Sequence, residues 1–102
     1  MSKETITASL IATNGEVTTF EIDYPIEYDP DFKTLRDMIS ESDGITCDIL
    51  EFVAVDFLSC LAVDENGIAM QRELNIPATS FYSPGIYGPA IFFPVSKREL
   101  MD

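Results

Sequence analysis

The stretch that decides the fold is residues 4–24, ETITASLIATNGEVTTFEIDY, in which two runs of alternating apolar and polar residues flank Asn14-Gly15. Alternation with period two is typical of a β-strand that buries one face. An Asn-Gly pair tolerates the positive φ angles of a type I′ turn. The stretch therefore predicts a β-hairpin, with its first strand over residues 4–12 and its second strand starting at Glu16.

The alternation of the second strand continues to residue 31. Even positions from 20 to 28 carry Phe20, Ile22, Tyr24, Ile26 and Tyr28, and odd positions carry Glu21, Asp23, Glu27, Asp29 and Asp31. In an extended chain the five carboxylates would form one acidic face, opposite the apolar one. Pro25 has no N–H to donate, so we expect an edge strand or a segment that leaves the sheet near this residue.

An amphipathic helix is predicted over residues 30–41. Asp29 is suited to the N-cap and Pro30 to the first helical position, and Gly44 is a natural stop. Apolar residues recur at helical spacing: Phe32, Leu35, Met38 and Ile39. We expect this face of the helix to cover one face of the sheet.

Residues 45–63, ITCDILEFVAVDFLSCLAV, are almost continuously apolar and rich in β-forming residues. The run is too long for one typical strand, so we expect a bend, a bulge or a break at Asp56. The sequence Asp64-Glu65-Asn66-Gly67 predicts a second hairpin turn, followed by a short return strand through residues 68–70.

The last third of the chain predicts a short helical turn over residues 76–82, capped by Asn75, and a final buried strand over residues 90–95. Together these elements predict a single α+β domain over residues 1–102. Its mainly antiparallel sheet has about five strands packed by one principal helix, with room for a second short helix.

The composition excludes several classes of function. Eighteen acids, six bases and no histidine give a formal charge of −12. Without histidine there is no Ser-His or Cys-His nucleophilic pair and no imidazole metal ligand, so we expect no enzyme, no catalytic or metal-binding residue and no cofactor. The charge disfavours direct binding of nucleic acid and of anionic membranes. With no apolar run near ~20 residues and no secretory signal, we expect a soluble cytoplasmic protein.

The chain contains two cysteines, Cys47 and Cys60. The sequence leaves a disulfide between them open. In an intracellular setting, two reduced and buried thiols are the expectation.

Residues 61–70, LAVDENGIAM, together with Leu74-Asn75, Ala78-Thr79 and residues 86–90, IYGPA, resemble an uncharacterised family of small proteins carried by phages, plasmids and other mobile elements. That family's pattern is a hydrophobic strand, an Asp-Glu-x-Gly turn, a Leu-x-x-Asn-x-x-Ala-Thr segment, and Ile-x-Gly before a final strand. The resemblance extends over about residues 8–95, although Leu74 and Asn75 are adjacent here where the family's spacing is looser. It implies a setting rather than an activity: a small accessory viral or plasmid protein made inside a bacterial or archaeal cell.

Three classes of function remain. The first is an accessory protein that binds a host protein with a basic surface and inhibits it, in host takeover or counter-defence. In one version the acidic face occupies the site of a nucleic-acid-binding protein, because carboxylates ~6–7 Å apart approach the linear charge density of one DNA strand to within about twofold. The other interpretation of that face is a solvated edge strand kept soluble by its charges. The second class is an assembly module that forms homo-oligomers. A metal- or carboxylate-dependent enzyme ranks last.

A second and weaker candidate site for a partner is the loop that carries Phe81, Tyr82 and Tyr87 between prolines and glycines. Aromatic side chains on a rigid loop are suited to anchoring a partner protein. The alternative is that they close one end of a small core.

Overall fold

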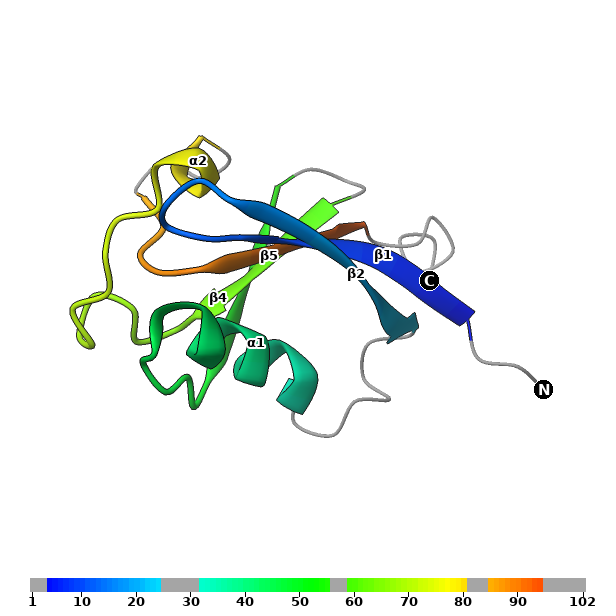
Figure 1. Cartoon of the computed structure of the whole chain (residues 1–102), viewed down its shortest axis with the longest axis horizontal. Coiled ribbons are helices and arrows are strands. Elements are labelled where there is room, and N and C mark those ends of the chain that lie inside the picture. The colour runs from blue at the N-terminus through cyan, green and yellow to red at the C-terminus, as the bar shows by residue number, and fades with distance from the viewer. Residues whose placement is uncertain (1–3, 25–31, 56–58, 81–84, 95–102) are drawn as a thin grey trace.

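The structure, a computed structural model, describes residues 4–24, 32–55, 59–80 and 85–94. Its strands are β1 (Glu4–Ile11), β2 (Val17–Tyr24), β3 (Leu50–Ala54), β4 (Ser59–Asp64) and β5 (Ala90–Pro94). They form one sheet in the order β2-β1-β5-β4-β3, and every neighbouring pair is antiparallel. Helix α1 (Lys33–Asp43) and the short helix α2 (Ile76–Thr79) accompany the sheet (Figure 1). The predicted α+β class, with a sheet of about five strands and one principal helix, is confirmed.

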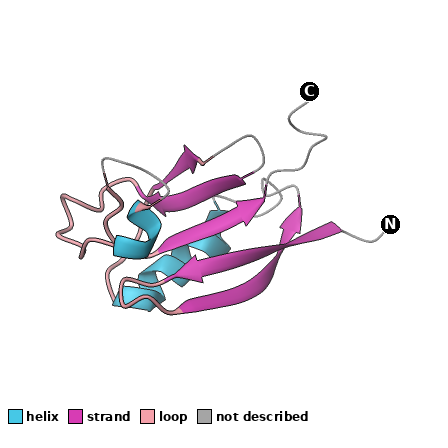
Figure 2. Cartoon of the chain, turned by 90° about the horizontal axis from the view of Figure 1, so that it is seen from above, coloured by secondary structure: helices cyan, strands magenta, loops and turns pink. Residues whose placement is uncertain are grey.

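The two helices lie on opposite faces of the sheet (Figure 2). The core under α1 contains Ala8, Ile22, Leu35, Ile39, Cys47, Ala62, Ile91 and Phe93. The core on the α2 side contains Ile11, Val53, Leu61, Val63, Ala78, Ile86 and Ala90. Adjacent residues of β4 and β5 belong to different cores, as the alternation of side chains along a strand requires. These two strands are therefore central and buried on both faces.

The first hairpin forms as predicted, but its turn is of another type. The Gly15 N–H donates to the Ala12 carbonyl at 3.0 Å, and the Ala12 N–H donates to the Glu16 carbonyl at 2.9 Å. Gly15 has a φ of 92°, whereas Asn14 has no positive φ and its side chain accepts the Glu16 N–H at 2.9 Å. This geometry is a type I turn followed by a glycine bulge, so the predicted type I′ turn is wrong.

Strand β2 is an edge strand and ends at Tyr24, directly before Pro25, which confirms the edge prediction. Helix α1 begins later than predicted, because its N-cap is Phe32 in the left-handed conformation (φ 54°). The ring of Phe32 packs edge-to-face on Phe52, with ring centroids 5.0 Å apart, so a tertiary contact accompanies the start of the helix. The predicted cap Asp29 and the predicted first helical residue Pro30 lie outside the described residues. Gly44 ends the helix as predicted, and its N–H donates to the Ser40 carbonyl at 2.9 Å.

The apolar run over residues 45–63 is divided into β3 and β4, which confirms a break in the run between Ala54 and Ser59. Asp56 itself lies outside the described residues. The Asp64–Gly67 turn also forms, since the Gly67 N–H donates to the Asp64 carbonyl at 3.1 Å. The predicted return strand through residues 68–70 is wrong: this segment forms turns, and Ile68 is 72% exposed. Both edges of β4 are already occupied, by β3 and β5, so no position beside β4 remains for a returning strand.

Asn75 caps α2 as predicted, its side chain accepting the Ala78 N–H at 3.1 Å. The helix is a single turn and ends at Thr79. The last predicted strand is β5, which occupies the centre of the sheet between β1 and β4.

Candidate protein-interaction surfaces

The predicted acidic face falls only partly on described residues. Glu21 is exposed on β2 opposite Thr7, whose hydroxyl donates to its carboxylate at 3.4 Å. Its neighbours Phe20 and Ile22 pack toward α1, so Glu21 lies on the other face of the sheet. Asp23 lies in β2 at the position opposite Thr5. Glu27, Asp29 and Asp31 lie outside the described residues, so the continuous acidic face stays a prediction.

The aromatic loop is described in part. Phe81 and Tyr82 lie outside the described residues. Tyr87 is half-buried and forms an isolated antiparallel bridge with Leu74. Its carbonyl lies against Gly67, where an added Cβ would come within 2.6 Å of the Tyr87 oxygen. Tyr87 therefore holds the segment 64–75 against the end of the sheet, and its role in binding a partner stays a prediction.

A buried charged cluster lies where the end of β4, the end of α1 and the segment after β4 meet. The side chain of Arg72 is 0% exposed, and its Nε donates to Asp64 at 2.7 Å, whose side chain is 1% exposed. The Nη1 atom of Arg72 donates to both carboxylate oxygens of Asp43 at 2.6 Å, and its Nη2 atom donates to the Ile45 carbonyl at 2.8 Å. Arg72 thereby connects the end of β4 to the end of α1 and to the loop that follows α1.

The charge of Arg72 is stabilised by these partners. Burial alone disfavours the guanidinium charge, but the hydrogen bonds and charges of Asp43 and Asp64 outweigh it, so the pKa of Arg72 is raised above its usual value. No local sequence pattern singles out Arg72, because its partners lie 8 and 29 residues away along the chain.

A buried amide completes the same region. Asn75 is fully buried, and its Nδ2 donates to the Ile11 carbonyl at 2.8 Å and to the Gly88 carbonyl at 2.9 Å. Its oxygen caps α2 through the Ala78 N–H. Asp64, Asn75 and Gly88 therefore have roles in the fold, as hydrogen-bonding or close-packed positions.

Neither cysteine is suited to act as a nucleophile. Burial, and then the charge of Asp64, raises the pKa of the Cys47 thiol to about 11. Burial also raises the pKa of Cys60. Both thiols are free, and within the described ranges no group of three or more histidine, cysteine, aspartate or glutamate residues could hold a metal ion. Nor is any helix in the described part of the chain long and apolar enough to cross a membrane.

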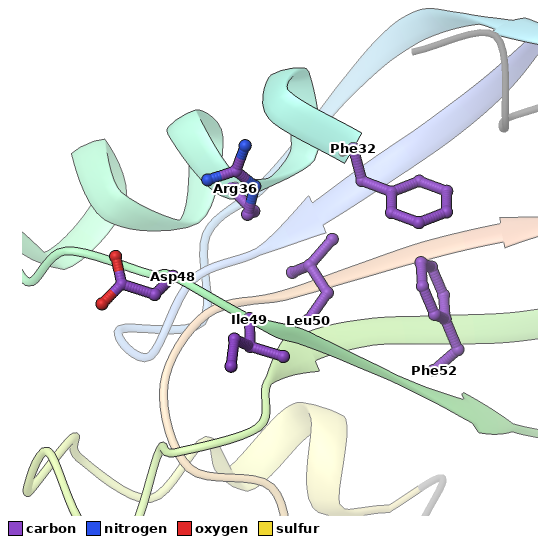
Figure 3. Close-up of a pocket in the computed structure, with 6 residues that line it drawn as sticks. All are labelled: Phe32, Arg36, Asp48, Ile49, Leu50 and Phe52. Atoms are coloured by element: carbon purple, nitrogen blue, oxygen red, sulfur yellow. The ribbon is translucent and has the colours of Figure 1, made fainter. Parts of the chain in front are cut away.

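A groove between α1 and the edge strand β3 was not predicted. It has a volume of about 380 Å³ and is lined by Phe32, Arg36, Asp48, Ile49, Leu50 and Phe52. Figure 3 shows an aromatic end, where the side chains of Phe32 and Phe52 lie near one another, and a charged end formed by Arg36 and Asp48. Phe52 is 39% exposed although its ring also lies 6.1 Å from that of Phe93. The sequence signal was Glu51, a charge within an apolar run, which indicates that β3 is not buried on both sides.

Most of the acids whose side chains the structure describes are exposed. Ten acids have described side chains, and eight of them are exposed: Glu16, Glu21, Asp37, Glu41, Asp48, Glu51, Glu65 and Glu73. The other two, Asp43 and Asp64, are the partners of Arg72. Comparisons with protein-family models, with curated proteins and with solved structures found no match to this chain.

Proposed function

We propose that this protein is an accessory factor, of the kind that a phage or mobile element supplies, which binds and inhibits a host protein through a basic surface of that host protein. The observation that supports the proposal is the location of the charge. The buried trio of Arg72, Asp43 and Asp64 has a charge of +1 − 2 = −1, so the remaining charged groups carry −12 − (−1) = −11. Outside the trio, every acid whose side chain the structure describes is exposed.

The electrostatic field of an acidic surface attracts a basic partner before the two proteins touch. A field of one sign raises the rate of encounter with a partner of the opposite sign, and this effect is screened beyond about 8–10 Å at ordinary ionic strength. In the narrower version of the proposal, the partner's basic surface is a nucleic-acid-binding site. The row from Glu21 to Asp31 would then take the place of phosphates.

The test is affinity capture on the immobilised full chain. We expect basic host proteins to be retained at about 50 mM salt and released near 500 mM, since exposed charge pairs are weakened by screening. Addition of duplex DNA separates the versions: displacement of the partner supports occupation of a nucleic-acid site. Partners that remain bound at high salt, or a captured set with no excess of basic proteins, would contradict the proposal.

Self-association is the second candidate function, and the two open edges of the sheet, β2 and β3, favour it. The net charge of −12 on each copy opposes it. Sedimentation at several salt concentrations distinguishes the two functions, because an assembly module forms a stable homo-oligomer without a host partner.

A further inference from the structure

Strand β3 has an outer edge that no strand among the described residues pairs with. The Val55 N–H donates to the Ser59 carbonyl, and the Glu65 N–H donates to the Ile49 carbonyl, which fixes the phase of the β3–β4 ladder. In an antiparallel ladder, alternate residues direct both backbone groups to the same side. The N–H and C=O groups of Leu50, Phe52 and Ala54 therefore point away from β4, where no described strand pairs with them.

This edge borders the groove under α1. The side chains of Leu50 and Phe52 lie on the α1 side, where they line the groove with Phe32. Glu51 and Val53 alternate with them, and Val53 belongs to the core on the α2 side. A strand added to this edge would place every second side chain in the groove and the others beside Glu51.

The charges around the edge select the composition of such a strand. Asp48 at the end of the groove and Glu51 on the strand are both exposed. Glu65, which follows β4 and pairs with Ile49, adds a third exposed acid near the same edge. Cationic side chains beside Glu51 and Glu65, in alternation with apolar ones in the groove, would satisfy both the groove and these two carboxylates.

We propose that the β3 edge and the α1–β3 groove bind an extended segment of a partner protein, in which apolar residues alternate with lysine or arginine, by addition as a sixth strand. The segment would be about five residues long, or roughly 17 Å, to match β3. Backbone hydrogen bonds would supply the direction and register, and the groove would supply the preference for apolar side chains. The inference rests on the proposed function and names the partner's binding segment.

A second copy of this chain fits the edge less well. Pairing two β3 edges would bring Asp48, Glu51 and Glu65 of one copy close to the same acids of the other, on two molecules that each carry −12. Like charges in adjacent strands are destabilising. A cationic partner removes this repulsion.

The probe is a synthetic peptide of about nine residues in which lysine alternates with phenylalanine and valine, and its affinity for the full chain is measured by titration calorimetry. Backbone groups of alternate peptide residues face β3, and the others face solvent. Two N-methylated peptides, blocked at even or at odd positions, must therefore differ in affinity by at least about tenfold. A peptide of the same composition with its lysines grouped in a block should bind more weakly than the alternating one.

Two matched pairs of variants locate the site. Ala54→Pro removes an outward N–H of β3, whereas Thr19→Pro removes an outward N–H of the opposite edge strand β2. Glu51→Lys and Glu73→Lys change the net charge equally, but only Glu51 lies on β3. We expect Ala54→Pro and Glu51→Lys to weaken binding of the alternating peptide by about tenfold or more, and the two controls by about twofold or less.

Equal affinities of the two methylated peptides would overturn the inference, and this measurement uses the unaltered protein even if Ala54→Pro fails to fold. Equal loss in Thr19→Pro and Ala54→Pro would overturn it as well. A homodimer that Ala54→Pro dissociates would identify a second copy as the occupant and also overturn it. If Ala54→Pro still captures basic proteins in a salt-dependent way, the proposed function holds but the β3 edge is not the binding site. Failure of the inference can therefore be distinguished from failure of the proposed function.

Discussion

Gly88 lies directly against the aliphatic part of Arg72, so closely that a Cβ atom on Gly88 would collide with Cδ of the arginine. The Gly88 N–H also donates to the Glu73 carbonyl at 2.7 Å, beside the same side chain. The chain before β5 thus closes over Arg72 and holds its guanidinium between Asp64 and Asp43. This contact gives a physical reason for a glycine at this point of the Ile-x-Gly segment.

Gly88→Ala should therefore destabilise the protein more than Gly15→Ala does. The two glycines have nearly the same φ, 95° and 92°, so the backbone strain of an alanine is alike at both, about 1–2 kcal/mol. Only Gly88 adds a collision, for which about 1–3 kcal/mol more is expected, whereas nothing lies within 4 Å of a Cβ at Gly15. Urea unfolding measures both. Equal losses of the free energy of unfolding would show that Arg72 moves aside without cost.

Arg72→Met is expected to lower the free energy of unfolding by about 3–5 kcal/mol, because it leaves the buried carboxylate of Asp64 without its partner. Adding Asp64→Asn to Arg72→Met removes that charge and should recover part of the loss. Lys33→Met is the control: Lys33 and Asp37 form an exposed i,i+4 pair, for which about 0.5 kcal/mol or less is expected. A double variant no more stable than Arg72→Met would show that lost packing, and not the unpaired charge, causes the effect.

Asn75→Ala should cost about 2–4 kcal/mol. The substitution removes the buried amide that donates to the Ile11 and Gly88 carbonyls and accepts the Ala78 N–H. Asn66→Ala is the matched control, since Asn66 is exposed and its backbone N–H, which alanine retains, donates to Asp64 at 2.9 Å. Thermal and urea unfolding should show little change for this control. Similar stabilities of the two variants would contradict the role assigned to Asn75.

The sequence predicted those parts of the fold that depend on local pattern. Period-two alternation identified the first hairpin, and Gly44 and Asn75 marked a helix end and a helix start. The return strand through Ile68 and Met70 could not be rejected from sequence, because the reason for its absence is the pairing of β4 with β5, which lies about thirty residues further along the chain. The burial of Arg72 depends in the same way on distant partners.

The candidate sites were predictable to a similar extent. Local alternation predicted that Glu21 points away from the core, and it is exposed. The groove joins Phe32 at the start of α1 to Phe52 on β3, and this pairing follows from how the helix crosses the sheet. The contact between Phe32 and Phe52 cannot be predicted from residue spacing within either segment. The exposed Glu51 within an apolar run was a local sign that one face of β3 is open to solvent.

The stability of the protein should fall with rising pH between about 9 and 11 in part because of Cys47. Its pKa is about 11 in the folded protein and 9.0 in an ordinary setting, so below pH 9 both states keep the proton. Between these values the unfolded chain loses the proton while the folded chain retains it, which favours unfolding. Cys47→Ala removes this contribution, so the stabilities of this variant and the parent protein should converge as pH rises through this window. Cys60→Ala, measured alongside, corrects for the second buried thiol, and a constant difference between parent and Cys47→Ala from pH 8 to about 11 would contradict the assignment.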